Sequence, residues 1–126
     1  MALLHPNIML ASDGLMDNGQ GHPRAAGAFP RFVRNYVGSG RLSLDEAVYK
    51  MATMPAAKLG LSHKGNLHSG ADADVVVLDL DQIADRATFD QPNAGPEGFD
   101  YVLVGGEVAV DHDRVVRSDL GRALRK

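Results

Sequence analysis

The chain has 126 residues, of which 44% are apolar, and this is enough for one compact domain with a modest core. Its formal net charge of -3 and its lack of a Lys/Arg cluster with interleaved aromatic residues argue against nucleic-acid binding, although the C-terminal end is mildly basic. With no cysteine, disulfides, thiolate nucleophiles and Cys-based zinc sites are excluded, so any metal has to be held by histidine or carboxylate.

The hydropathy pattern predicts neither a membrane span nor a secretory signal. No run of about 18 apolar residues occurs, and no basic start is followed by an apolar stretch. A cytoplasmic location is the default expectation.

The first expected element is a short strand at residues 7–11. A nearly continuous apolar run from Ile8 to Ala11 is typical of a buried strand that is covered on both faces. Ser12-Asp13-Gly14 ends this strand, and a Gly-rich loop follows it.

The next residues predict helices. From Phe29 to Val37 the apolar side chains recur at helical spacing, with Pro30 near the first turn and Gly38-Ser39-Gly40 as the stop. Ser43 and Glu46 then have the spacing of a capping box at the start of another helix.

That second helix is expected to break at Pro55. Thr53 would then cap a further short helix, which ends at Gly60.

The second half of the chain predicts a small antiparallel sheet. A β-branched strand is expected at residues 73–80, and residues 101–104 and 107–110 form a hairpin around Gly105-Gly106. Residues 111–113 offer another turn, and residues 81–98 form a long irregular connection. The predicted fold class is therefore α+β, with a helical part at residues 1–62 and a small β domain at residues 63–126, packed as one unit.

Candidate chemistry lies just after the first expected strand. Asp13 has the position at which barrel enzymes place catalytic groups, at the C-terminal end of a parallel strand. The alternative is that Asp13 caps a turn through its own side chain. His22 and Arg24 could stand at the mouth of the same pocket, where Arg24 would bind a substrate carboxylate, but a solvent-exposed loop fits them equally well.

The remaining histidines do not have the spacing of a metal site. The expected surface histidines are His5, His63, His68 and His112, because none has the i, i+2 or i, i+4 partner that would place two imidazoles on one metal.

Several segments together resemble a known family. "SDG" after an apolar strand, then "HPR", "GAFPRFVRNYV", "LSLDEAVYKMATMPAAKLGL", "GADADVVVLDLDQIADRATFDQP" and "YVLVGGEVAV" occur in this order. The combination resembles the C-terminal part of the N-acyl-D-amino-acid deacylases (D-aminoacylases), in the metal-dependent amidohydrolase superfamily.

The resemblance implies a fold and a role for Asp13. In that family the SDG strand is the eighth of a (β/α)8 barrel, and its Asp carries a proton from zinc-activated water to the leaving amine. The helices would cover the barrel exterior, and the β segment would belong to a β-sandwich domain built from both chain ends. His22 and Arg24 would be loop residues near the substrate, with no catalytic role implied.

The resemblance also implies what the chain lacks. A (β/α)8 barrel takes about 250 residues, and the family's His-x-His motif and other metal ligands lie on earlier strands. We therefore expect an inactive C-terminal fragment that binds no zinc alone, with Asp13 a metal ligand only if the missing barrel is present. The unpaired first strand predicts self-association, in its sharper form a dimer that buries residues 7–12, or else disorder of about the first twenty-five residues.

The leading hypothesis is a piece of a zinc-dependent amide hydrolase that acts on a small N-acyl-D-amino acid or a related N-acyl compound. One alternative is a non-catalytic binding or assembly module that completes a separately encoded barrel. Another is a fragment of a dihydroorotase-like or hydantoinase-like enzyme, whose last barrel strand also carries an Asp.

Overall fold

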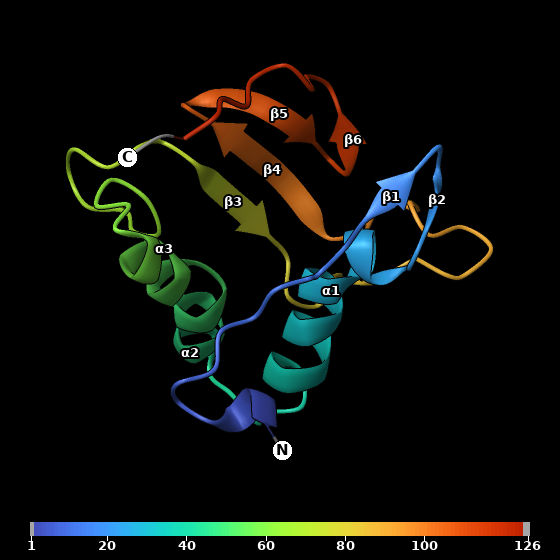
Figure 1. Cartoon of the computed structure of the whole chain (residues 1–126), viewed down its shortest axis with the longest axis horizontal. Coiled ribbons are helices and arrows are strands. Elements are labelled where there is room, and N and C mark those ends of the chain that lie inside the picture. The colour runs from blue at the N-terminus through green and yellow to red at the C-terminus, as the bar shows by residue number, and fades with distance from the viewer. Residues whose placement is uncertain (1, 125–126) are drawn as a thin grey trace.

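Two helical arms lie below a four-stranded sheet in the computed structural model, which describes residues 2–124 (Figure 1). A short 3-10 helix, η1 (Ala2–Leu4), begins the described chain. An extended segment then runs up between the two arms to a small hairpin. Within residues 2–124 no helix has the length and apolar character needed to cross a bilayer.

The first arm consists of α1 (Arg24–Phe32), which continues as a π-helical turn, η2 (Val33–Val37). The predicted stop at Gly38 is confirmed, but the predicted start is wrong, because the helix begins at Arg24 and Pro30 lies in its interior. Three alanines in the first five residues give this turn a high helix propensity, and they outweigh Gly27.

The second arm consists of α2 (Leu44–Val48), the π-helical turn η3 (Tyr49–Thr53) and α3 (Met54–Leu59). The predicted capping box is confirmed: the Glu46 N–H donates to Ser43 Oγ at 3.2 Å, and the Ser43 N–H donates to Glu46 Oε2 at 2.7 Å. The helix ends at Gly60, as predicted, with φ of 71°.

The predicted break at Pro55 is wrong. The arm is continuous because Pro55 falls in the first turn of α3 and the wider turn before it accommodates the missing N–H. Thr53 has helical dihedral angles and makes no capping bond; its hydroxyl donates instead to the Gly65 carbonyl at 2.7 Å.

The core lies between the two arms. Phe32, Leu42 and Ala47 are buried there, and Leu10 and Met51 are among the half-buried side chains that pack against them. This small core joins the first arm, the second arm and the extended N-terminal segment.

The predicted strand at residues 7–11 is wrong. These residues are extended, but within residues 2–124 no strand pairs with them, and strand geometry requires such a neighbour. The Gly-rich loop instead contains an unpredicted hairpin of β1 (Met16–Asp17) and β2 (Gln20–Gly21). Asn18 and Gly19 form its turn with φ of 48° and 78°, as a two-residue hairpin requires.

The antiparallel sheet has the order β3-β4-β5-β6. Its strands are β3 (Val75–Leu78), β4 (Phe99–Val104), β5 (Glu107–Asp111) and β6 (Arg114–Val115). The predicted hairpin is confirmed, because Gly105 and Gly106 have φ of 60° and 87° between β4 and β5. The predicted turn before β6 is also confirmed, at His112 and Asp113.

The connection between β3 and β4 is irregular, as predicted. An isolated bridge between Ala84 and Glu97 joins an early part of this connection to the residues just before β4. The observed order of helices followed by an antiparallel sheet agrees with the predicted α+β class, whereas the division at residue 62 stays a prediction.

Candidate functional site

Asp13 lies at the point where the extended segment turns into the β1-β2 hairpin. Its backbone is left-handed, with φ of 47°, and its side chain is 88% exposed. The turn here is capped by Ser12, whose Oγ accepts from the Gly14 N–H at 3.2 Å. The capping role that was the alternative for Asp13 is therefore filled by its neighbour.

Arg24 holds Asp13 at two points. Its Nε donates to the Asp13 backbone carbonyl at 2.8 Å, and its Nη2 lies 2.9 Å from Asp13 Oδ2. Arg24 is the first residue of α1, so both bonds connect the start of this helix to the turn at Asp13. An exposed ion pair adds little stability, and what this one provides is orientation.

His22 contacts this pair through the backbone of Arg24. Its Nδ1 accepts from the Arg24 N–H at 3.1 Å. Its ring meets Phe89 edge-on, with the ring centroids 5.1 Å apart and the planes at 76°. The structure thus joins the side chains of Asp13 and Arg24 directly, and joins His22 to them only through the Arg24 backbone.

Phe89 is a neighbour of this site that sequence reasoning missed. It comes from the irregular connection between β3 and β4 and is 75% exposed. No periodicity links residue 89 to residue 22, so only the unusual presence of an aromatic residue in a polar run could have drawn attention to it.

The described residues do not fit a metal site. Within residues 2–124 no three His, Asp or Glu side chains lie close enough together to hold an ion. His5, His63 and His112 have local partners, namely the Asn7 N–H, the Gly70 carbonyl and the Asp111 carboxylate. A zinc site needs three or four ligands, and Asp13, already paired with Arg24, supplies one carboxylate.

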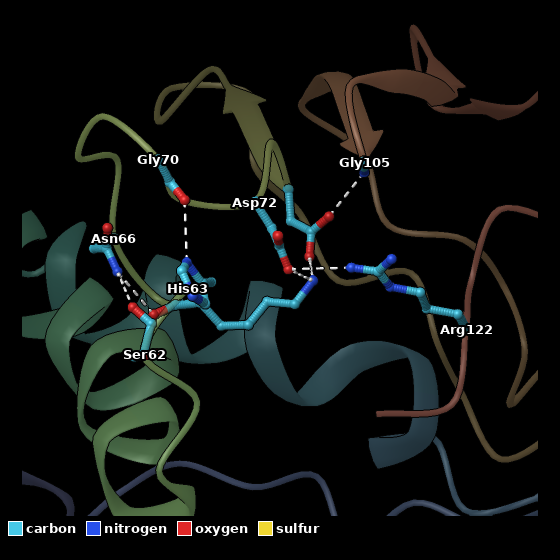
Figure 2. A network of polar contacts seen from close by, with 9 residues as sticks. Ser62, His63, Asn66, Gly70, Asp72, Gly105 and Arg122 are labelled. Atoms are coloured by element: carbon cyan, nitrogen blue, oxygen red, sulfur yellow. Dashed lines mark hydrogen bonds and ion pairs between the residues drawn. The ribbon is translucent and has the colours of Figure 1, made fainter. Parts of the chain in front are cut away.

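A second polar cluster, also missed from the sequence, lies between the arm that ends in α3 and the sheet (Figure 2). Lys64 binds the carboxylates of both Asp72, at 2.9 Å, and Asp74. Asp74 Oδ1 also accepts from the Gly105 N–H at 2.8 Å, and Arg122 Nη2 lies 3.6 Å from Asp72 Oδ2. The hydrogen bonds of Lys64 lower the pKa of each carboxyl group, and those from the two carboxylates raise the pKa of Lys64.

This Lys64 cluster borders a cavity of about 820 Å³ between α3, the start of β3 and the C-terminal residues 120–124. Lys64 and Arg122 both face carboxylates, so their charges are balanced within the cluster. The ion pairs and the hydrogen bond to Gly105 join the segment after α3 to the β4-β5 hairpin, and their role is therefore structural.

Known protein sequences similar to this chain include several deacylases and an L-hydantoinase, and a family model also matches it. A sequence model of the amidohydrolase family matches residues 5–110. An N-acyl-D-glutamate deacylase from Alcaligenes xylosoxydans xylosoxydans is 45% identical over 103 residues, which are 81% of this chain and 21% of that protein. An L-hydantoinase from Paenarthrobacter aurescens is 44% identical over a shorter stretch of 55 residues, which is 43% of this chain.

Solved structures resemble the fold closely. A D-aminoacylase with a binuclear metal center superposes with a TM-score of 0.90 at 36% identity, over 98% of this chain and 26% of that one. An N-acyl-D-glutamate deacylase from Bordetella bronchiseptica, complexed with zinc and a phosphonate inhibitor, superposes with a TM-score of 0.80 at 42% identity, over 85% and 23% of the two chains. The chain therefore spans about a quarter of the length of the proteins that it matches.

Proposed function

This chain belongs to the amidohydrolase family, and we propose that it forms the C-terminal part of a zinc-dependent deacylase that cleaves the amide bond of N-acyl-D-amino acids. The observation that carries the proposal is the Asp13–Arg24 pair, which holds one carboxylate at the end of an extended segment. Three deacylases match 81–95% of the chain, whereas two dihydroorotases match 64% and 66% of it and the L-hydantoinase matches 43%, and this favours the deacylase branch.

In the proposed reaction Asp13 moves one proton. Its carboxylate takes a proton from the attacking water as the water oxygen bonds to the amide carbon, and it returns that proton to nitrogen as the C–N bond breaks. The products are a carboxylic acid and a free amine. Arg24 keeps the carboxylate in one orientation throughout, through its bonds to the Asp13 backbone and side chain.

The zinc of such an enzyme requires ligands from polypeptide other than these residues, because residues 2–124 do not bring three suitable side chains together. For the same reason the chain alone is proposed to be inactive. In the intact enzyme residues 7–11 would gain strand neighbours as the last strand of the barrel, the helical arms would cover its outside, and the four-stranded sheet would be part of a β-sandwich.

The test is a hybrid enzyme in which this chain replaces the matching fifth of the Alcaligenes N-acyl-D-glutamate deacylase. The expected result is hydrolysis of N-acyl-D-glutamate that Asp13→Asn reduces by about 10²- to 10⁴-fold in kcat, the usual contribution of a general acid/base. Asp17→Asn is the matched control, since Asp17 is an exposed carboxylate in the adjacent hairpin, and it should leave kcat unchanged.

Full activity of the Asp13→Asn hybrid would refute the assigned role. If the hybrid is inactive but the chain restores activity when mixed with the remaining four fifths of the deacylase, the assembly-module hypothesis is favoured instead.

A further inference from the structure

Lys50, in η3, is a buried charged residue for which the proposed reaction gives no role. Its side chain is 4% exposed, and lysine is almost never buried without partners. The partners of its ammonium group are two backbone carbonyls, that of His5 at 2.6 Å and that of Ile8 at 3.2 Å. Both carbonyls belong to the extended segment that leads to Asp13.

The backbone of Lys50 binds the same segment, because the Leu10 N–H donates to the Lys50 carbonyl at 3.1 Å. In a regular α-helix this carbonyl would accept from the N–H of residue 54. Here the Met54 N–H donates one residue further back, to Tyr49, as a π turn requires. The following residue is Pro55, which has no N–H to offer. The π turn and Pro55 together leave the Lys50 carbonyl available to Leu10.

One residue of the second arm thus makes three hydrogen bonds to the segment of residues 5–10, which has no strand beside it within residues 2–124. Beyond them the segment is held again at Asp13, by Arg24. The path of the chain into the candidate site therefore has one anchor on each arm, Arg24 on the first and Lys50 on the second.

We propose that Lys50 is a positioning residue, which sets the path of residues 5–10 and thereby the place of the Asp13 carboxylate. The inference rests on the proposed function, in which that carboxylate moves the proton. Lys50 acts through backbone carbonyls and touches no reacting atom, so its contribution is geometric. Misplacement of a catalytic group by about 1 Å can cost about 10²-fold in rate.

The first test is amide hydrogen exchange in the purified chain, which needs no activity. Lys50→Met keeps the length and packing of the side chain but removes its two hydrogen bonds. The amide of Leu10 should exchange about tenfold faster, because the segment loses two hydrogen bonds of ordinary strength. The exchange rate of the Ala47 amide in α2 should stay unchanged. Lys58→Met, on the exposed side of α3, is the control and should change neither amide. Unchanged exchange at Leu10 in the Lys50→Met chain would overturn the proposal.

A second variant decides the matter if Lys50→Met unfolds the chain and all amides exchange quickly. Pro55→Ala leaves Lys50 in place and adds an N–H that can compete for the Lys50 carbonyl. Faster exchange at Leu10, with Ala47 unaffected, supports the proposal. Unaltered exchange at Leu10 refutes the anchoring role of this carbonyl and of the turn that exposes it.

The functional half is tested in the hybrid deacylase. Lys50→Met should lower kcat by about 10- to 100-fold with little change in KM, and it should add no further loss when Asp13 is already Asn. Losses that multiply would show that Lys50 acts elsewhere and would overturn the proposal. If Asp13→Asn itself has no effect, the proposed function fails, while the exchange measurements still decide whether Lys50 anchors the segment.

Discussion

At the scale of single residues, Ser43 begins the second helical arm with a reciprocal pair of hydrogen bonds to Glu46. Such a cap satisfies N–H groups that the first turn of a helix leaves unpaired. Ser43→Ala should therefore lower the free energy of unfolding by about 0.5–2 kcal/mol in urea titrations. Ser69→Ala, at an exposed loop position, is the control, and equal stabilities of the two variants would contradict this account.

Gly27 allows α1 to pack closely against Asp85, because glycine has no Cβ. A Cβ on Gly27 would lie 2.2 Å from Asp85 Oδ1, and Asp85 is held in place, because Arg31 Nε donates to its Oδ2 at 2.7 Å and its Oδ1 accepts from the Ala87 N–H. The Asp85 side chain is only 7% exposed, so it has little space into which it could move.

Gly→Ala within a helix normally stabilises it by up to about 1 kcal/mol. For Gly27→Ala we expect the opposite: overpacking should lower the free energy of unfolding by about 1–3 kcal/mol, as measured by chemical denaturation. Gly95→Ala, where nothing lies near the new Cβ, should be close to neutral. A stabilised Gly27→Ala chain would show that the contact between α1 and Asp85 is looser than described.

At the scale of elements, the Lys64 cluster joins the segment after α3 to the β4-β5 hairpin, and it predicts a pH dependence of stability. The pKa values of Asp72 and Asp74 are lowered in the folded chain, first by hydrogen bonds from Lys64. A lowered carboxyl pKa contributes stability above its unfolded value of about 3.8, and that stability is lost as the pH falls through the folded pKa. The raised pKa of Lys64 acts in the opposite direction. Its contribution to stability is present below pH 10.5 and is lost as the pH rises through the folded pKa.

The measurement is the urea midpoint of the native chain and of Lys64→Met between pH 2 and pH 8. The native chain should be the more stable of the two at neutral pH, and the difference should shrink as the pH falls below about 4. Lys58→Met should follow the native curve. A difference that stays constant down to pH 2 would contradict the role assigned to the cluster.

The elements also show which predictions a sequence supports. The Ser43 capping box and the Gly105-Gly106 hairpin were predicted because each depends on residues that are close together in the chain. The strand at residues 7–11 was wrong because a strand depends on a neighbour, and the observed partner of Leu10 is the Lys50 carbonyl, forty positions away. Asp13, His22 and Arg24 were proposed from motifs and stay predictions as site residues. The bonds of Arg24 to Asp13 could not be predicted, because they depend on where α1 begins, which the sequence pattern placed five residues too late.

At the scale of the whole molecule, the extended segment exposes apolar side chains, and no strand of the described residues 2–124 pairs with it. Ile8 and Met9 are 37% and 38% exposed, so the predicted self-association through residues 7–12 stays a prediction that sedimentation equilibrium can test. The native chain should form a dimer that Met9→Lys weakens. Leu67→Lys, at a more exposed leucine in the loop after α3, should leave the dimer intact. A native chain that remains monomeric at high concentration would exclude this association.

We propose that these residues supply the proton-transfer carboxylate of a deacylase but cannot hold its metal by themselves. The most direct measurement is hydrolysis of N-acyl-D- and N-acyl-L-amino acids by the purified chain with added zinc, beside its Asp13→Asn variant. We expect that neither protein turns over any substrate above the buffer rate. Zinc-dependent turnover by the native chain that disappears in Asp13→Asn would contradict it, because the chain would then assemble a metal site from its own residues.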